Sequence, residues 1–382
     1  MFGAGLFARP AIHALSRRGI TPSCIVDNSK AKQGSKIMGI PVLAPLEGLG
    51  SCPDAKVIIT AAPKYIGEIL SQTQAMGWTS VYDCSSLLAS FEYDRETFES
   101  GVSQLHFDLD SYFYDYFNLY YPEKLILPSL DVVITEKCSL KCRDCANLMQ
   151  YYAHPEDVDF KKLFDSLDIL MQCVDHVLEF RVLGGETFMN RHAHEYINRL
   201  RKYENYTRIA VYSNGVIVPK GENLECLVSE DTYLRVSDYG PLSRKMREML
   251  ELFDSRGIIY SVMTLEGWQD CAKIFKRERT RAELESVYSC CCAKNTLTLL
   301  DERVYVCPFA ANAANLGALP QFQDSIPVTE KFSTDAIKER LFRMLRASDF
   351  FSACQYCAGR PLDSIPLPPA IQSSEPLPYV KL

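Results

Sequence analysis

Long apolar runs are missing from this chain of 382 residues. No run reaches the roughly 18 apolar residues of a membrane-spanning helix, so we expect no membrane partner. An excess of basic residues is also missing, because the formal net charge is −7. Nucleic-acid-binding proteins usually carry a strong basic excess, so we expect no nucleic-acid partner either. The first residues show no charged segment followed by an apolar core, and they give no sign of a secretory signal.

Cysteine, in contrast, is abundant, with 15 residues, whereas 47% hydrophobic and 23% charged residues are ordinary for a soluble globular protein. The length predicts two or three domains. An odd number of cysteines without an export signal does not indicate a disulfide framework. Nine of the cysteines fall into two groups, which are treated below. The remaining six are scattered among apolar neighbours and are expected to be small buried side chains: Cys24, Cys52, Cys84, Cys173, Cys226 and Cys271.

Residues 1–95 alternate strand-like and helix-like segments, which predicts a Rossmann-like domain with a parallel sheet. A turn with Gly3 and Gly5 leads into a helical stretch, and Asp27 ends the second strand candidate 22 positions after Gly5. Glycines in such a turn permit close approach to a phosphate, and the helix N-terminus supplies donors. Only two residues precede the turn, so the first strand is nearly absent. Gly3, Gly5 and Asp27 leave two interpretations open: a nucleotide site, or a structural or recognition role.

Residues 96–127 are dense in tyrosine and phenylalanine and predict a connecting helix, with a stacking site as the alternative. Strand–helix alternation resumes over 128–288, and five or six such units predict a partial or full βα barrel. The active sites of such barrels lie at the carboxyl ends of the strands. The first cysteine group, a Gly-Gly-Glu turn and two polar turns follow these strands and are expected at that edge. The expected strands are 131–135, 177–183, 208–212, 233–236 and 258–263.

A small cysteine-rich α+β region follows over 289–360, around a short strand pair at 296–300 and 304–307. Residues 361–382 contain six prolines and no hydrophobic periodicity, which predicts an extended tail. The predicted fold class is therefore α/β: a Rossmann-like parallel sheet, a partial (β/α)6 barrel and a small cysteine-rich extension.

Cys138, Cys142 and Cys145 place three thiols within eight residues. Zinc sites usually take four ligands in spaced pairs, whereas three thiolates on one loop suit a [4Fe–4S] cluster whose fourth iron stays open. An open iron can chelate a substrate as well as carry an electron. The segment 134–152, ITEKCSLKCRDCANLMQYY, resembles the radical S-adenosylmethionine (SAM) superfamily in spacing and placement. It departs at Asp144, where members often carry an aromatic residue, but this position supplies no ligand.

This resemblance implies that SAM binds the open iron through its amino and carboxylate groups. Reductive cleavage of SAM would then give methionine and a 5′-deoxyadenosyl radical, which abstracts a hydrogen atom from the substrate. Gly184-Gly185-Glu186 matches the Gly-Gly-Glu motif of the superfamily, in which backbone and carboxylate contact the SAM amino group. Ser213-Asn214-Gly215 resembles the segment near the ribose and carboxylate of SAM. Ser237 is a candidate ribose contact, with a turn or helix-cap serine as the alternative.

The second cysteine group consists of Cys307, the pair Cys354 and Cys357, and a run at 290–292. Four thiolates are enough to close a cluster completely. The layout resembles the twitch, or half-SPASM, extension of some radical SAM enzymes, which holds one auxiliary [4Fe–4S] cluster. Within the run of Cys290, Cys291 and Cys292, the sequence does not determine the ligand; we favour Cys291, with Cys292 next. A structural zinc site with the same four thiolates is the alternative.

The resemblance covers about residues 128–360 and implies an enzyme that oxidises or epimerises a small polar substrate. A carbohydrate or nucleotide-linked sugar is favoured, because the N-terminal unit looks like those of polysaccharide-tailoring enzymes. The resemblance also implies a flavodoxin- or ferredoxin-type reductant, and oxygen-labile clusters imply a cytoplasmic enzyme. Two alternatives stay open: a peptide-modifying maturase of the same superfamily, and a non-enzymatic zinc-thiolate binding protein. No catalytic side chain is assigned.

Overall fold

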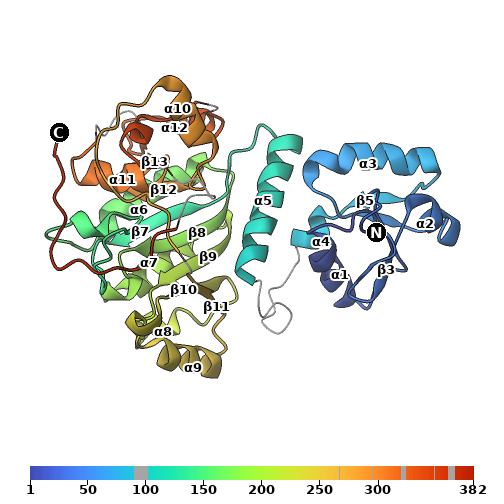
Figure 1. Cartoon of the computed structure of the whole chain (residues 1–382), viewed down its shortest axis with the longest axis horizontal. Coiled ribbons are helices and arrows are strands. Elements are labelled where there is room, and N and C mark those ends of the chain that lie inside the picture. The colour runs from blue at the N-terminus through green and yellow to red at the C-terminus, as the bar shows by residue number, and fades with distance from the viewer. Residues whose placement is uncertain (90–101, 266, 295, 320–323, 348, 360–365) are drawn as a thin grey trace. The chain divides into compact units, whose positions relative to one another are not determined.

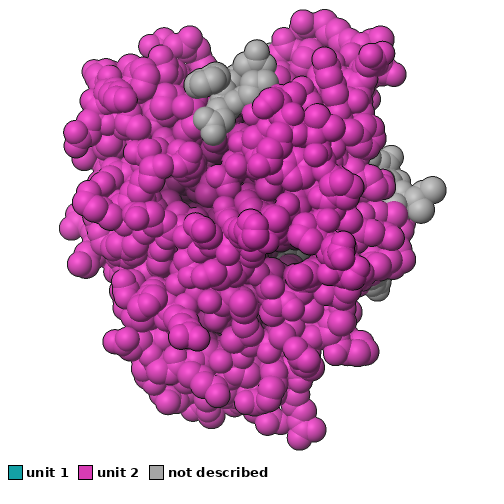
Figure 2. Space-filling view, turned by 90° about the vertical axis from the view of Figure 1, so that its left-hand side faces the viewer, with its two compact units in different colours: residues 1–124 teal, residues 125–382 magenta. Residues whose placement is uncertain are grey.

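The computed structural model of the chain describes residues 1–89, 102–265, 267–294, 296–319, 324–347, 349–359 and 366–382 (Figure 1). The fold is α/β, as predicted, with a large and mostly parallel sheet that is consistent with a partial barrel. The chain forms two compact units, Met1–Lys124 and Leu125–Leu382, and the larger one fills the view of Figure 2. None of the described helices is long and apolar enough to cross a membrane.

The smaller unit is built on a short, mainly parallel sheet. β1 pairs with β3 and β4 pairs with β5, each in parallel, and Phe2 bridges the two pairs through Val26 and Ile59. The sequence predicts that the first strand is nearly absent, and in the structure Phe2 alone takes its place between β1 and β4. β2 joins β3 in antiparallel fashion. The elements of this unit are α1 (Ala8–Ser16), β1 (Ile25–Val26), β2 (Lys36–Ile37), β3 (Ile40–Leu43), α2 (Pro45–Ser51), β4 (Val57–Ile59), α3 (Pro63–Met76), β5 (Val81–Asp83), α4 (Ser85–Ala89) and α5 (Val102–Tyr120).

Helix α5 is the described part of the aromatic-rich segment at 96–127, of which residues 96–101 lie outside the described residues. Leu109 and Tyr112 of this helix are buried in one cluster with Phe7. The rings of Phe7 and Tyr112 meet edge to face, with centroids 4.8 Å apart. Aromatic side chains bury a large apolar area each, so these contacts anchor α5 to the core of the smaller unit.

The larger unit contains a nine-stranded sheet in the order β11-β10-β9-β8-β7-β12-β13-β14, with β6 beside β8. β7 to β12 run parallel, whereas β13 and β14 are antiparallel. Helices connect the parallel neighbours, as the predicted βα units require (Figure 1). The elements of this unit are β6 (Ile126–Leu127), β7 (Leu130–Thr135), α6 (Phe160–Cys173), β8 (His176–Gly184), α7 (Ala193–Leu200), β9 (Tyr206–Ser213), α8 (Glu222–Glu225), β10 (Thr232–Asp238), α9 (Met246–Arg256), β11 (Tyr260–Thr264), α10 (Arg281–Ser289), β12 (Leu297–Leu300), β13 (Arg303–Tyr305), α11 (Pro308–Asn315), β14 (Ser325–Pro327) and α12 (Thr334–Leu345).

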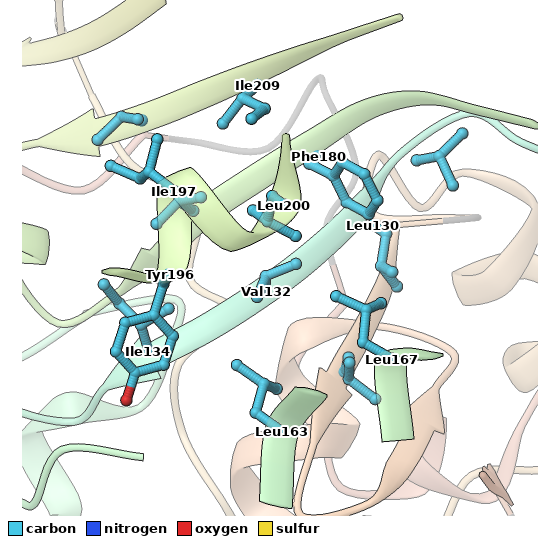
Figure 3. Close-up of a cluster of buried hydrophobic side chains, with 14 of the residues drawn as sticks. Leu130, Val132, Ile134, Leu163, Leu167, Phe180, Tyr196, Ile197, Leu200 and Ile209 are labelled. Atoms are coloured by element: carbon cyan, nitrogen blue, oxygen red, sulfur yellow. The ribbon is translucent and has the colours of Figure 1, made fainter. Parts of the chain in front are cut away.

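Strand β7 lies inside this sheet, between β8 and β12, and all of its residues are buried. Its alternate side chains Leu130, Val132 and Ile134 lie on one face, and Leu163 and Leu167 of α6 belong to the same core cluster (Figure 3). Fully burying one such side chain contributes about 1.5–3 kcal/mol to folding. Helices α7, α9 and α12 add to this core. The loop after β7 is therefore held at its base by a rigid core.

The opposite face of the parallel strands carries buried charges. Glu179 on β8 accepts hydrogen bonds from Arg181 Nε at 2.9 Å, Arg208 Nε at 3.0 Å and Tyr233 Oη at 2.5 Å. Arg235 Nε donates to Tyr233 Oη at 3.0 Å. Burial by itself raises the pKa of Glu179, but Arg208 and Arg181 outweigh burial and hold this pKa well below its usual range. The network ties β8, β9 and β10 together through one carboxylate.

Glu179→Gln is expected to lower the apparent free energy of unfolding by about 3–5 kcal/mol, because removing one partner of a buried ion pair leaves the other charge uncompensated. Urea unfolding at pH 7 measures this change. The control is Glu251→Gln, which removes the partner of Arg247 on an exposed face of α9 and should leave the unfolding midpoint unchanged. Equal midpoints for the two variants would contradict the role assigned to Glu179.

The C-terminal residues 366–382, called the C-terminal strap from here on, lie in extended form along loops of the larger unit. Leu367 pairs with Trp268, and Gln372 pairs with Cys142, each in antiparallel fashion. Tyr379 Oη donates to Leu316 O at 3.0 Å near the end of the chain. Segments that are far apart in the sequence are thus joined near the first cysteine group.

Candidate metal centres

The first cysteine loop follows β7 and lies in a small apolar cluster. Cys142 is buried, and Cys138 and Cys145 are half-buried beside it. The rings of Tyr239 and Trp268 pack against the same cluster and meet edge to face, with centroids 5.6 Å apart. The structure thus brings the three cysteines together and adds two aromatic side chains that no sequence motif marks. The whole cluster comprises Cys138, Leu140, Cys142, Cys145, Val216, Ile217, Tyr239, Leu242, Trp268 and Ala370.

Two side-chain amides donate hydrogen bonds to sulfur atoms of this loop. Asn214 Nδ2 lies 3.7 Å from Cys138 Sγ, and Gln372 Nε2 lies 3.4 Å from Cys142 Sγ. Burial raises the pKa of the Cys138 thiol, and it raises the pKa of Cys142 to about 11. A buried thiolate needs positive charge beside it, which a metal centre supplies. Three cysteines on one loop, two of which accept hydrogen bonds at sulfur, therefore fit the donor set of an iron–sulfur cluster.

The turn at the end of β8 packs on the backbone that leads into the cysteine loop. Gly185 N donates to Thr135 O at 2.9 Å, and Glu186 N donates to Lys137 O at 2.8 Å. A Cβ atom on Gly184 would lie 2.0 Å from Thr135 O, and one on Gly185 would lie 2.1 Å from Lys137 O. Gly184 also has a φ of +150°. Glycine at both positions therefore permits the close approach of this turn to the cysteine loop.

Gly185→Ala is expected to displace the cysteine loop and to remove about half of the iron of the loaded protein, on the order of four atoms per chain. The reason is the overlap of the added Cβ with Lys137 O, a backbone atom that cannot rotate away. Iron content after anaerobic reconstitution measures the loss. Gly67→Ala is the control, since a Cβ at Gly67 meets open space. Iron content equal to that of the unmodified chain would contradict this packing role.

The carboxylate of Glu186 joins the ends of β8 and β9. It accepts from Asn214 N at 2.7 Å, from Ser213 Oγ at 3.0 Å and from Phe188 N at 3.3 Å, and its side chain is completely buried. Burial raises the pKa of Glu186 to about 7 despite these hydrogen bonds. The resemblance implies that this carboxylate contacts the SAM amino group, and that contact stays a prediction. Through Asn214, Glu186 connects to Cys138.

Ser237 lies at the end of β10, one strand beyond Ser213. Ser243 Oγ donates to Ser237 O at 3.2 Å and to Asn214 O at 2.7 Å. Ser243 therefore links the ends of β9 and β10, although no sequence motif marks it. The predicted SAM-contacting residues from β8, β9 and β10 thus lie at one edge of the sheet, together with the cysteine loop after β7.

The second cysteine group lines a cavity of about 580 Å³, including space open to solvent. Cys291, Cys307, Cys354 and Cys357 all contribute to its wall. These residues come from the turn after α10, the start of α11 and the segment around the 3₁₀ helix Ser352–Gln355. The rest of the wall is mostly apolar and includes Val287, Tyr288, Leu297, Val306, Phe309, Met344 and Phe351. The structure thus assembles four thiols around one largely apolar space.

Of the three consecutive cysteines at 290–292, the middle one lines this cavity. Cys290 and Cys292 are exposed, and Cys292 Sγ donates to Gln269 Oε1 at 3.3 Å. Cys291 is half-buried and lies in the cavity wall. The structure therefore groups Cys291 with the other three cysteines and places Cys292, the second choice, outside the wall.

Backbone N–H groups donate hydrogen bonds to two sulfur atoms of this second group. Ala310 N donates to Cys307 Sγ at 3.4 Å, so Cys307 caps the N-terminus of α11. Gly359 N donates to Cys357 Sγ at 3.3 Å. A helix N-terminus favours negative charge, which suits a thiolate at Cys307. Burial raises the pKa of Cys354 to about 11, so this thiol also needs positive charge to ionise.

Two charged residues hold the segment that carries Cys354 and Cys357. Arg279 donates to the carbonyl oxygen of Cys357 at 2.7 Å and to that of Ala358 at 3.0 Å. The carboxylate of Asp324 accepts from Ser352 N at 2.9 Å and from Ser352 Oγ at 2.8 Å. No motif marks Arg279 or Asp324, because each is distant from the cysteines in the sequence and acts on the backbone.

Across the described part of the chain, no three His, Cys, Asp or Glu side chains converge closely enough to hold a single metal ion. A structural zinc site requires four ligands around one ion. In a [4Fe–4S] cluster each cysteine binds a different iron, so the ligands need not converge on one point. A [4Fe–4S] cluster therefore requires less convergence of its ligands than a single zinc ion does. The thiol donors of both cysteine groups are of the type that binds such a cluster.

In the smaller unit, the glycine turn and Asp27 contact each other. Asp27 Oδ2 accepts from Ala4 N at 2.7 Å. Gly3 has a φ of +115°, and a Cβ there would lie 3.0 Å from the backbone of Thr60, whereas Gly5 faces open space. These contacts give Gly3 and Asp27 structural roles beside the ends of the short strands. Nucleotide binding stays a prediction.

No family model matches this chain, and no curated protein matches it. Among solved structures, anSMEcpe with bound AdoMet and Cp18Cys peptide is similar over 35% of this chain and 42% of that chain, at 17% identity and a TM-score of 0.29. BtrN in complex with AdoMet and 2-DOIA is similar over 66% of this chain and 99% of that chain, at 13% identity and a TM-score of 0.42. Streptococcus suis SuiB bound to precursor peptide SuiA is similar over 54% of this chain and 46% of that chain, at 18% identity and a TM-score of 0.31.

The structural similarity to these three proteins is thus partial and at low identity. It spans less than half the length of anSMEcpe, 42%. Neither the reaction nor the substrate of this chain follows from matches at this level.

Proposed function

We propose that this chain is a radical SAM enzyme with two [4Fe–4S] clusters. The proposal rests on the hydrogen bonds that join the cysteine loop to the ends of β8 and β9 at one edge of the parallel sheet. Gly185 N contacts the strand before the cysteine loop, Glu186 accepts from Asn214 N, and Asn214 Nδ2 donates to Cys138 Sγ. Strand ends of this kind carry the active sites of βα barrels. The three motifs that the sequence singles out are therefore parts of one hydrogen-bonded assembly.

In this proposal Cys138, Cys142 and Cys145 hold a cluster with one open iron. When bound, the cluster and SAM supply a 5′-deoxyadenosyl radical for hydrogen abstraction. Besides its proposed contact with SAM, Glu186 fixes the backbone of Asn214. The residues proposed to contact SAM are Gly184, Gly185, Glu186, Ser213, Asn214 and Ser237.

In this proposal the half-buried rings of Tyr239 and Trp268 shield one side of the cysteine loop from water. Both rings belong to the apolar cluster that surrounds the three cysteines. Burial raises the pKa of Tyr239, so its hydroxyl stays protonated at neutral pH. A protonated phenol can donate a hydrogen bond without adding negative charge beside the cysteines. A site closed to water also limits side reactions of a reactive radical.

The second cluster is assigned to Cys291, Cys307, Cys354 and Cys357, which leaves Cys292 outside the ligand set. Four thiolates complete a [4Fe–4S] cluster and leave no open iron. Such a group suits electron transfer and does not suit SAM binding. The support is the shared cavity wall and the backbone donors to Cys307 and Cys357.

The proposed reaction is the oxidation or epimerisation of a small polar substrate, with a carbohydrate or nucleotide-linked sugar favoured. A second redox group supports this class, because a carbon radical needs one further electron transfer to become a stable product. The smaller unit supports a Rossmann-like assignment through its strand order β2-β3-β1-Phe2-β4-β5. A flavodoxin- or ferredoxin-type protein is the proposed electron donor.

Anaerobic purification tests the cofactor content that this function requires. We expect a brown protein with about eight iron and eight sulfide ions per chain, since each [4Fe–4S] cluster contains four of each. Metal analysis and the visible absorption spectrum measure this. A colourless protein with stoichiometric zinc would contradict the proposal and favour a zinc-thiolate binding protein.

A further inference from the structure

The C-terminal strap, residues 366–382, forms a short ladder with the first cysteine loop. Arg143 N donates to Ile371 O at 2.7 Å, and Ser373 N donates to Lys141 O at 2.6 Å. These bonds flank Cys142, which pairs with Gln372 across the ladder. The backbone of the middle cysteine is thus held by a segment 230 residues later in the chain.

The side-chain amide of Gln372 has a defined orientation in this ladder. Its Oε1 accepts from Lys141 N at 2.8 Å, and its Nε2 donates to Ala370 O at 2.7 Å and to Cys142 Sγ at 3.4 Å. Exchanging the oxygen and nitrogen positions would place two donors against each other at Lys141 and two acceptors at Ala370. The hydrogen-bond network therefore directs an N–H group, and not a carbonyl oxygen, at the sulfur.

An N–H group directed at a cluster ligand has two physical consequences. It stabilises negative charge on the sulfur, which favours the reduced, more negative state of an iron–sulfur cluster and raises its reduction potential. It also orients the ligand, as partners of metal ligands generally do. Ala370, next to the ladder, is buried in the same cluster as Cys142 and Leu140, so the strap also covers the loop with apolar surface.

We propose that Gln372 is a positioning residue that sets the reduction potential of the cluster at Cys138, Cys142 and Cys145. The inference rests on the proposed function, because it requires a cluster at this loop. It adds a role for a residue outside the three motifs of the superfamily. The C-terminal strap thereby acts on the SAM-cleaving centre through Cys142.

The test is a redox titration of the reconstituted full-length chain. The reduced first cluster is monitored by electron paramagnetic resonance and is recognised because its signal changes when SAM is added. Gln372→Met keeps the length of the side chain and removes its donors. We expect a more negative potential, so that at a fixed solution potential the ratio of reduced to oxidised cluster falls about two- to tenfold. Gln372→Glu places an acceptor near the sulfur and should lower the ratio further. Gln372 is exposed, so neither change empties the core.

Ser373→Ala is the matched control on the same strap. Its Oγ contacts Glu375 O, and the bond from Ser373 N to Lys141 O remains after the change. We expect its potential to equal that of the unmodified chain. Equal potentials for Gln372→Met, Gln372→Glu and the unmodified chain would overturn the inference, while the proposed function would stand. A SAM-responsive signal missing from the unmodified chain would instead refute the proposed function.

Loss of the cluster provides a second readout. Gln372→Met should release iron from the first cluster faster than Ser373→Ala when an iron chelator is added under reducing conditions. The reason is the lost orientation of Cys142. Equal release rates together with equal potentials would show that the strap contributes only its backbone pairing, which contradicts a role for the Gln372 side chain.

Discussion

Replacing Cys138, Cys142 and Cys145 together with Ala should abolish SAM cleavage and remove about half of the iron, on the order of four atoms per chain. These three thiols lie at the sheet edge that also carries the Gly184 to Glu186 turn, and Cys138 is joined to that turn through Asn214. The measurement is the yield of 5′-deoxyadenosine after addition of SAM and dithionite, with iron determined on the same sample.

The control for this triple change is Cys52→Ala, which alters a cysteine of the smaller unit, outside both groups. It should leave iron and 5′-deoxyadenosine at the level of the unmodified chain. An undiminished yield from the triple variant would mean that SAM is cleaved elsewhere. A folded triple variant that loses the yield and keeps four iron atoms would agree with two independent clusters.

Replacing Cys354 and Cys357 together with Ser should remove the iron of the second cluster, again about half of the total. We expect 5′-deoxyadenosine formation to continue, because SAM cleavage needs only the cluster with the open iron. Turnover of the true substrate should stop, because a substrate radical needs an electron to leave or arrive. Iron, 5′-deoxyadenosine and product are measured in parallel on the soluble variant.

The three adjacent cysteines offer a matched control set for the second cluster. Cys291→Ser should lose iron as the double variant does, whereas Cys290→Ser and Cys292→Ser should keep it. Of these three, Cys291 lines the cavity and the other two are exposed. Iron loss from Cys292→Ser but not from Cys291→Ser would overturn the assignment. Full product formation by the double variant would show that the second group is structural.

The parallel strands β7 to β11 could be predicted because each combines an apolar run with a helix after it. The predicted range 177–183 corresponds to β8 (His176–Gly184), and 208–212 corresponds to β9 (Tyr206–Ser213). Spacing alone was enough to single out the three cysteines of the first loop. Such local patterns depend on neighbours in the sequence, and these are visible without a structure.

Pairings between distant segments could not be predicted in this way. β12 lies beside β7 with Thr298 opposite Asp131, so the strand pair of the cysteine-rich region extends the same sheet. Gln372 reaches Cys142 across 230 residues, from a segment whose composition indicates only an extended tail. Pairing of this kind is decided by the packing of the whole unit, and a single sequence holds no signal for it.

A short hairpin in the smaller unit was also missed. β2 and β3 are joined by Met38 and Gly39, which both have positive φ values, of 50° and 83°. Two positive φ values are typical of a type I′ turn, for which Asn-Gly is the usual signal and Met-Gly is not. Two-residue β2 is too short to show alternation, and Pro41 weakens the strand pattern of β3.

The choice among three consecutive cysteines shows the same limit at the site. Cys290, Cys291 and Cys292 have nearly identical sequence surroundings, so spacing could only rank them. The end of α10 at Ser289 sets which side chain turns toward Cys354 and Cys357. Which of three neighbouring cysteines becomes the ligand therefore depends on the residue at which the helix ends. Sequence patterns locate a helix end only to within a few residues.

The measurement that tests the central claim most directly is the formation of 5′-deoxyadenosine by the unmodified chain. The protein is purified and reconstituted without oxygen, then mixed with SAM and dithionite. The proposed function predicts 5′-deoxyadenosine and methionine in equal amounts, with none formed when iron or the reductant is left out. A reconstituted, iron-loaded chain that binds no SAM and forms no 5′-deoxyadenosine would contradict it.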